Sequence, residues 1–310
     1  MKVSMLLRGV LGVSVLALVP LAFWLWTPDK PLGELQASYR AAPGDSMQVG
    51  PWRLHVRESG PKDAPAVLML HGFGGSLHSW ETWAQALSAH HRVIRFDLPG
   101  HGLSESDPAG DYTDARSLQL TLALMDQLGV ARASLVGHSI GGRIAWTFAA
   151  RHPERTGRLV LVAPDGFASP GFEYGKATEV PAVLGLMRHV LPKAVLRMNL
   201  APAYADPAFL TDELTTRYHD LMLAPGGRDA MFKRLQQTVL TDPRPLLATI
   251  AAPTLLVWGE ADAMIPVANA QDYLGAVKGS RLVTLPGVGH LPQEEAAAAS
   301  LPAVADFLRP

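Results

Sequence analysis

A glycine–serine turn in the middle of the chain constrains the fold more than any other feature. The pentad G-H-S-I-G at 137–141 directly follows the apolar, strand-like run 133–136, and the residues after it, 142–150, have helical periodicity. With 28 glycines in the chain such a pentad can arise by accident, so its context carries the argument. Flanking glycines allow a sharp strand-to-helix turn that exposes the serine hydroxyl. The pattern therefore predicts that Ser139 is a nucleophile on a strained elbow.

A serine hydroxyl becomes a good nucleophile only when a nearby imidazole accepts its proton. The chain has 11 histidines, and most histidines are structural. His290 differs from the others because it ends a glycine-rich loop that follows the strand-like run 281–285 near the C-terminus. We therefore expect His290 to be the base, whereas His71, His101 and His138 are expected to hold loops or to pack beneath the turn.

A carboxylate must orient the imidazole of such a base. Asp262 follows the buried strand-like run 254–258, so its side chain is expected at the carboxyl end of a strand. Two alternatives stay open. Asp165 lies just after the strand-like run 159–163, and Glu260 lies two residues before Asp262.

Attack on a carbonyl carbon produces a negatively charged oxygen that needs preorganised N–H donors. The buried strand-like run 67–70 is followed by H-G-F-G-G at 71–75, where the glycines let the backbone approach a substrate. We assign the two donors to the backbone N–H groups of Phe73 and of Ile140, the residue after the predicted nucleophile.

Together these motifs resemble the α/β-hydrolase superfamily, in particular its capped membrane-associated lipases and esterases and its carbon–carbon bond hydrolases. The resemblance rests on the segments 71–76, 97–104, 137–141, 259–266 and 287–290, and extends from about Met47 to the C-terminus. It implies a Ser/His/Asp triad with no metal or organic cofactor. Haloalkane dehalogenases and epoxide hydrolases of the superfamily carry aspartate at the elbow, and Ser139 argues against both.

The order of apolar segments predicts one α/β domain with an insertion. Residues 46–165 and 246–310 alternate between strand-like and helix-like patterns, which favours a mostly parallel central sheet with helices on both faces. From 166 to 245 the strand signals vanish and prolines separate short helical stretches. We expect a helical cap here, inserted after the strand that follows the elbow helix, with apolar side chains that surround an acyl or aryl pocket.

The N-terminus carries a second long apolar segment. Gly9–Trp26 contains no charge and has 18 residues, so as a helix it would extend roughly 27 Å. We expect 1–26 to be an uncleaved membrane anchor, 27–45 to be a linker, and the catalytic domain to lie on the periplasmic or extracellular side. Secretion after cleavage of a signal peptide is the alternative.

Composition narrows the classes of partner. The formal net charge is −1 with both signs dispersed, which does not suggest a nucleic-acid partner. The chain has no cysteine, which excludes disulfides and thiolate catalysis. The oligomeric state stays open.

The expected function is hydrolysis of a small carboxylic ester with an apolar acyl or aryl group, through an acyl-enzyme intermediate. Three alternatives remain: a carbon–carbon bond hydrolase of the meta-cleavage type, an acyltransferase on the same triad, and a non-catalytic hydrolase-fold binding protein.

Overall fold

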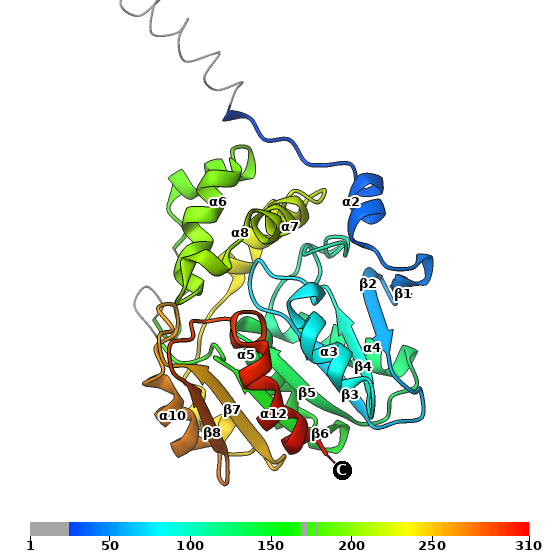
Figure 1. Ribbon diagram of the computed structural model, residues 1–310, viewed down its shortest axis with the longest axis vertical. Coiled ribbons are helices and arrows are strands. Elements are labelled where there is room, and N and C mark those ends of the chain that lie inside the picture. Colours follow the sequence, from blue (N-terminus) through cyan, green and yellow to red (C-terminus); the bar gives the residue numbers. More distant parts are fainter. Residues whose placement is uncertain (1–24, 169–172, 178, 310) are drawn as a thin grey trace, which may run out of the picture.

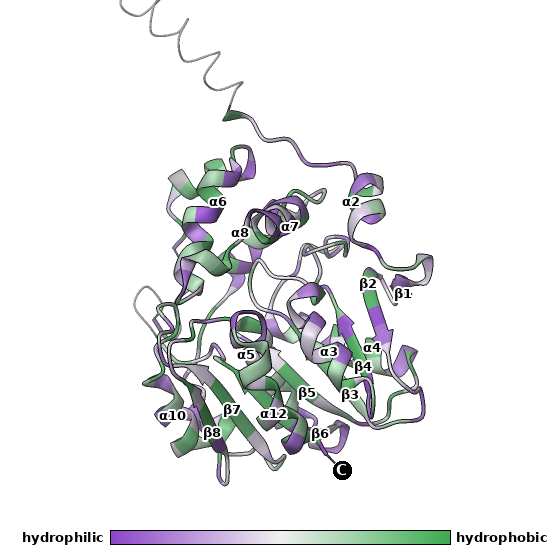
Figure 2. Ribbon diagram, viewed as in Figure 1, coloured by the Kyte–Doolittle hydropathy of each residue, from purple (hydrophilic) through white to green (hydrophobic). Residues whose placement is uncertain are grey.

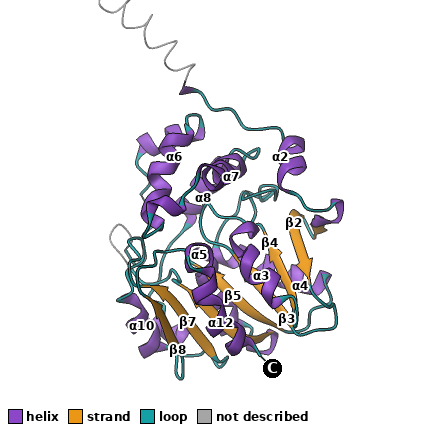
Figure 3. Cartoon of the chain, viewed as in Figure 1, coloured by secondary structure: helices purple, strands orange, loops and turns teal. Residues whose placement is uncertain are grey.

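A single mixed sheet organises the protein. The computed structural model describes residues 25–168, 173–177 and 179–309. Its strands are arranged in the order β1-β2-β4-β3-β5-β6-β7-β8 (Figures 1 and 3). They are β1 (Ser46–Val49), β2 (Trp52–Ser59), β3 (Ala66–Leu70), β4 (Arg92–Phe96), β5 (Ala133–His138), β6 (Thr156–Val162), β7 (Thr254–Gly259) and β8 (Arg281–Leu285). Only the β1–β2 and β2–β4 pairs are antiparallel, which confirms the predicted mostly parallel sheet.

The central strands are apolar on both faces because helices cover both faces. In β3, Leu68 and Leu70 pack into one core cluster, while Val67 and Met69 pack into the other. This division follows from the two-residue period of a strand, whose successive side chains point to opposite sides. Figure 2 shows the apolar colouring along the central strands.

Helices from distant parts of the chain form the outer layers. One face carries α4 (Asp114–Gln127), α5 (Ile140–Arg151) and α10 (Asn269–Ala276). The opposite face carries α3 (Glu81–Leu87) and α12 (Ala297–Leu308). Short helices α9 (Arg244–Leu247) and α11 (Pro292–Glu295) complete the core. Short 3₁₀ segments occur at Pro43–Asp45, Leu77–Trp80, Pro153–Arg155, Ala182–Arg188, Ala201–Ala203 and Pro207–Phe209.

The insertion between β6 and β7 forms the cap. Its helices are α6 (Lys193–Leu200), α7 (Asp212–Met222) and α8 (Gly227–Gln237). Helix α7 starts after Thr211, whose hydroxyl accepts a hydrogen bond from the N–H of Leu214. The cap lies beyond the sheet edge where the parallel strands end, so it covers that edge (Figure 1).

Residues 27–45 are packed onto the molecule, which corrects the expectation of a linker there. They include α2 (Leu32–Tyr39), in which Leu35 is 2% exposed and packs with Leu103 of the core and with Leu221 and Ala224 of the cap. The backbone N–H of Lys30 also donates to the carbonyl of Leu223. The segment thus contacts the core and the cap together.

The sequence predicted a membrane-spanning helix. Within the residues that the structure describes, this prediction is wrong. None of its helices combines the length and the apolar character that crossing a bilayer requires. The longest α-helix there, α4, has 14 residues, whereas a span needs about 20. The anchor was expected at 1–26, and residues 1–24 lie outside the described residues.

Leu35→Ala tests whether the segment before β1 belongs to the fold. Removing this buried side chain should lower the free energy of unfolding by about 3 kcal/mol, measured by urea denaturation. Glu34→Ala, an exposed neighbour on the same helix, should change it by less than about 0.5 kcal/mol. Equal small effects of the two substitutions would contradict the packing of α2.

Candidate active site

The turn at Ser139 has the geometry of a nucleophile elbow. Ser139 has φ 53° and ψ −121°, an unusual conformation for a residue with a Cβ. A Cβ on Gly137 would lie 2.3 Å from the carbonyl oxygen of Gly141, and one on Gly141 would lie 2.3 Å from the carbonyl oxygen of Leu70. Glycine is therefore required at both positions for β5 to turn directly into α5. Ser139 itself stays partly exposed.

The elbow lies where the strand order reverses. From β3 the chain continues to β4 on one side, and then to β5 on the other side. Such a switch point opens a crevice at the carboxyl ends of the strands, where α/β proteins bind ligands. Both loops that flank the crevice, 71–76 after β3 and the turn at Ser139 after β5, are ones that the sequence singles out.

The loop after β3 lies directly against the elbow. A Cβ on Gly72 would be 2.6 Å from His138 Nδ1 and 3.1 Å from Ser139 Cβ. Phe73, the next residue, is 38% exposed. Ile140 is the first residue of α5, so its N–H belongs to the first helical turn and has no partner within the helix. Of the two predicted oxyanion donors, Ile140 directly follows Ser139 in the chain, and Phe73 follows Gly72, the residue that lies against Ser139.

His290 and Asp262 form a buried pair. His290 Nδ1 lies 2.7 Å from Asp262 Oδ2, and the two residues are 4% and 7% exposed. The other oxygen of the carboxylate, Oδ1, accepts hydrogen bonds from the backbone N–H groups of Met264 and Ile265 at 2.8 and 2.9 Å. The carboxylate is thus held by its own loop and can orient the imidazole.

His138 connects the elbow to this pair. Its Nε2 lies 2.9 Å from the carbonyl oxygen of His290, so it donates there, and the two rings are 4.6 Å apart between centroids. Burial, and then the neighbouring His290, hold the pKa of His138 well below its ordinary value. His138 is therefore neutral. Because it directly precedes Ser139, its hydrogen bond holds the loop of His290 next to the elbow.

The two alternative acids have other partners. Asp165 forms an ion pair with Arg143 at 2.5 Å. Glu260 is exposed and accepts a hydrogen bond from the hydroxyl of Thr284 at 2.8 Å. Of the three candidate carboxylates, the structure brings only Asp262 to His290.

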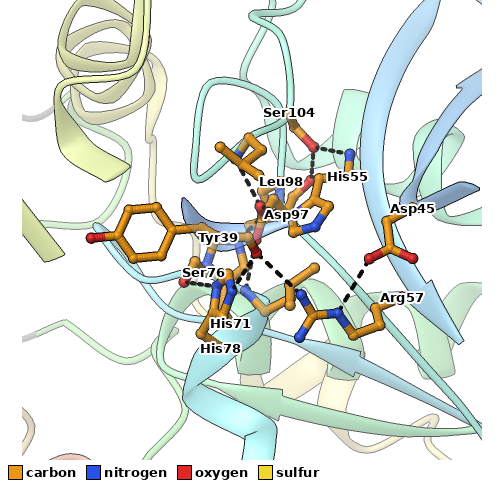
Figure 4. A network of polar contacts seen from close by, with 12 residues as sticks. Tyr39, Asp45, His55, Arg57, His71, Ser76, His78, Asp97, Leu98 and Ser104 are labelled. Atoms are coloured by element: carbon orange, nitrogen blue, oxygen red, sulfur yellow. Dashed lines mark hydrogen bonds and ion pairs between the residues drawn. The ribbon is translucent and has the colours of Figure 1, made fainter. Parts of the chain in front are cut away.

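A second buried carboxylate supports the loop that carries Phe73 (Figure 4). Asp97 Oδ1 accepts from the N–H of Leu77 at 2.6 Å, and Oδ2 accepts from the N–H of Leu103 at 2.8 Å and lies 2.7 Å from His55 Nδ1. Burial raises the pKa of Asp97, but the neighbouring histidines, His55 first and then His71 and His78, together lower it overall. The pairing of Asp97 with His55 has no signal in the sequence, since 42 residues separate them.

His71 is fixed in one tautomer by the same loops. Its Nε2 accepts from the N–H of Leu98 at 2.9 Å, so its Nδ1–H donates to the carbonyl of Gly72 at 2.8 Å. Burial lowers the pKa of His71, which agrees with a neutral ring. The expectation that His71 fixes loop geometry fits this arrangement.

An apolar cavity of about 380 Å³ lies between the cap and the Phe73 loop. Its polar side chains are few: Asn199, Tyr218 and Arg228. Its apolar and glycine lining is Phe73, Gly74, Leu184, Met187, Leu191, Leu196, Leu200, Met222, Met231, Phe232, Leu235 and Met264. The cap contributes most of this apolar lining, as expected, whereas Met198 of the cap is 71% exposed and lies outside the lining.

Comparison with known proteins establishes the class. Residues 65–297 match the family described as alpha/beta hydrolase fold. The chain belongs to this superfamily, as the elbow, the strand order and the cap indicate.

Individual relatives differ in what they do. The chain is 32% identical over 270 residues to a 2-hydroxy-6-oxononadienedioate/2-hydroxy-6-oxononatrienedioate hydrolase of Pseudomonas putida, covering 83% of this chain and 92% of that protein. It is 34% identical over 260 residues to the dihydrolipoyllysine-residue acetyltransferase component of the acetoin cleaving system of P. putida, where the match covers 81% of this chain but 65% of the relative. A candidate lipase of Acinetobacter baumannii AYE superposes with a TM-score of 0.76 at 26% identity, covering 91% and 97% of the two chains.

His78 lies just beyond the Phe73 loop, with its Nδ1 3.2 Å from the hydroxyl oxygen of Ser76. Acid should destabilise the protein through this residue. Burial lowers the pKa of His78 to about 4, so between pH 6.5 and 4 the unfolded chain binds the proton that the folded protein excludes. The free energy of unfolding should therefore fall as the pH falls through this window. Between pH 7 and pH 5 the wild type should lose about 2 kcal/mol more than His78→Gln. Urea denaturation at both pH values measures this difference, and parallel losses would contradict the burial of a neutral His78.

Proposed function

We propose that the protein is a serine hydrolase that cleaves carboxylic esters with an apolar acyl or aryl group. The observation that carries this proposal is the position of the apolar cavity. It is bounded by Phe73 and Gly74, which follow the residue packed against Ser139, and by Met264, two residues after Asp262. An acyl group in this cavity would present its carbonyl carbon to the elbow.

The proposed reaction has two halves. His290 accepts the proton of Ser139 as the hydroxyl oxygen attacks the ester carbonyl, and the N–H groups of Phe73 and Ile140 stabilise the oxyanion. His290 then protonates the departing alcohol. Water attacks the acyl-enzyme by the same route and releases the acid, while Asp262 stabilises the imidazolium in both halves.

Carbon–carbon bond hydrolysis is the second candidate. It is supported by the 32% identity to a hydrolase of 2-hydroxy-6-oxo dienedioates over most of both chains. The apolar lining of the cavity favours the ester substrate because a dienedioate carries two carboxylates, and Arg228 is the only basic side chain in the lining described. Acyl transfer to an acceptor other than water would use the same acyl-enzyme.

Parallel kinetics on an aryl ester with a medium-length acyl chain and on a vinylogous diketone acid separate the two candidates. We expect kcat/KM to be higher for the ester. A higher value for the diketone acid would replace ester hydrolysis with carbon–carbon bond cleavage, while the roles of the site residues would be retained.

Ser139→Ala should reduce hydrolysis of the aryl ester by roughly 10⁴-fold or more without loss of folding. The wild type should also be labelled at Ser139 by a fluorophosphonate, as shown by mass spectrometry of the digested protein. Ser38→Ala is the matched control, since Ser38 is an exposed serine on α2. Retained turnover in Ser139→Ala would refute the nucleophile.

Substitution of Asp262 and of Asp165 tests which carboxylate is the acid of the proposed triad. Asp262→Asn should lower kcat roughly 10⁴-fold because the imidazole loses the charge and the tautomer that it requires. Asp165→Asn should weaken the contact with Arg143 but should change kcat by less than about tenfold. The reverse order of effects would transfer the role of the acid to Asp165.

A further inference from the structure

The loop of His290 is hydrogen-bonded to the cap. The N–H of His290 donates to the carbonyl of Ala203 at 2.8 Å. Glu295 bridges the two parts, since it accepts from the N–H of Asp206 in the cap at 2.9 Å and from the N–H of Gly289 at 2.7 Å. A Cβ on Gly289 would lie 2.6 Å from the carbonyl oxygen of Ala203, so the backbones are in direct contact.

Glu294 makes three further connections to the cap. Its Oε2 accepts from the hydroxyls of Tyr204 at 2.7 Å and Tyr218 at 3.0 Å, and its Oε1 accepts from Nη2 of Arg217 at 3.1 Å. The Glu294 side chain is 7% exposed. Three donors from the cap thus converge on one buried carboxylate, four residues after His290.

The chemistry of the donors makes this contact persistent. Burial raises the pKa of both Tyr204 and Tyr218, so each hydroxyl keeps its proton and donates. Hydrogen bonds to an ionised acceptor are stronger than those between neutral groups, and Arg217 supplies the opposite charge. A buried carboxylate that lost these partners would be strongly disfavoured.

Tyr218 belongs to two environments at once. Its side chain lines the apolar cavity, and its hydroxyl binds Glu294. A continuous set of contacts therefore runs from the cavity wall through Tyr218 and Glu294 to the loop that carries His290.

We propose that Glu294 is a positioning residue that makes the placement of His290 depend on how the acyl group fills the cavity. An acyl chain long enough to pack against Tyr218 holds that ring, and through it Glu294 and the His290 loop, in the arrangement that activates Ser139. A short chain leaves the ring without this support. The inference rests on the proposed function because it assigns the cavity to the acyl group.

Covalent labelling of Ser139 in the full-length chain tests this proposal. Alkyl fluorophosphonates with ethyl and octyl chains are compared by their maximal inactivation rate and by their half-saturating concentration. In the wild type the octyl probe should have the higher maximal rate. In Tyr218→Phe and in Glu294→Gln this advantage in rate should shrink by about tenfold, as expected for loss of a hydrogen bond to a charged group, with a smaller change in half-saturation.

If Glu294 contributed only to the stability of the fold, the labelling experiment would give a different result. Both variants would then unfold more readily, but the ratio of octyl to ethyl rates would equal that of the wild type, and this outcome would overturn the proposal. The same holds if the wild type shows no advantage for the octyl probe. Glu154→Gln, which replaces a side chain 67% exposed on the core, is the matched control and should keep the wild-type ratio.

Further variants cover the case in which Glu294→Gln does not fold, and they test whether Tyr218 and Glu294 act through one contact. If Glu294→Gln does not fold, Tyr204→Phe and Tyr218→Phe, which keep the rings and the carboxylate, supply the measurement. The double variant Tyr218→Phe/Glu294→Gln should lose less than the sum of the single losses because one contact is removed twice, and full additivity would count against the coupling.

The labelling experiment also distinguishes this proposal from the proposed function. If Ser139 is labelled and the octyl advantage depends on Glu294, but no ester is hydrolysed, only ester hydrolysis fails. If esters are hydrolysed and the ratio is unchanged in the variants, only the positioning role fails. A wild type that is not labelled refutes both.

Discussion

The structure depends on one backbone constraint, the close approach of β5 and α5 around Ser139. A positive φ at a serine is costly and persists only when its surroundings enforce it. Here the enforcement is steric, because Gly137 and Gly141 allow main-chain contacts that any Cβ would prevent. The contact between Gly141 and the end of β3 also places the Phe73 loop beside the turn. The proposed nucleophile and the predicted oxyanion donors are therefore held by the same packing.

Two buried carboxylates near the elbow are hydrogen-bonded to backbone N–H groups. Asp97 binds the N–H groups of Leu77 and Leu103, and Asp262 binds those of its own loop. Neutral histidines fill the space between these loops, and His138 donates to the backbone of His290. Since unpaired groups at such sites would be expensive, each hydrogen bond stabilises a particular loop conformation. The geometry of the site thus depends on several loops that are distant in sequence.

The cap covers the carboxyl ends of the parallel strands, and it also binds the loop that carries His290. Residues 203–218 bind the His290 loop through main-chain contacts and through Glu294 and Glu295. On its other side the cap is bound by the segment before β1, where Lys30 forms an ion pair with Asp220. The cap therefore contacts both the loop of the proposed base and the N-terminal segment.

The sequence by itself determined the fold class, the elbow and the order of the motifs. These are local or periodic features: apolar runs of strand length, glycines at a turn, and an insertion without strand signals. It also pointed to Asp262 and His290, but it left Asp165 and Glu260 open because all three carboxylates lie at or just beyond the ends of strands. Only tertiary structure decided which carboxylate reaches the imidazole, since that depends on the register of β7 and β8 and on the ion pair that engages Asp165.

Other features had no local signal. The pairing of His55 with Asp97, the packing of Leu35 and the binding of Glu294 by Tyr204, Tyr218 and Arg217 join residues far apart in the chain. Residues 27–45 were expected to be a linker because proline and polar residues dominate them, yet a single buried leucine and a few backbone hydrogen bonds fasten them to the fold. Local pattern thus determines which elements form. Which side chains meet is decided only when the sheet, the cap and the loops exclude water together, because burial is a property of the whole packed chain.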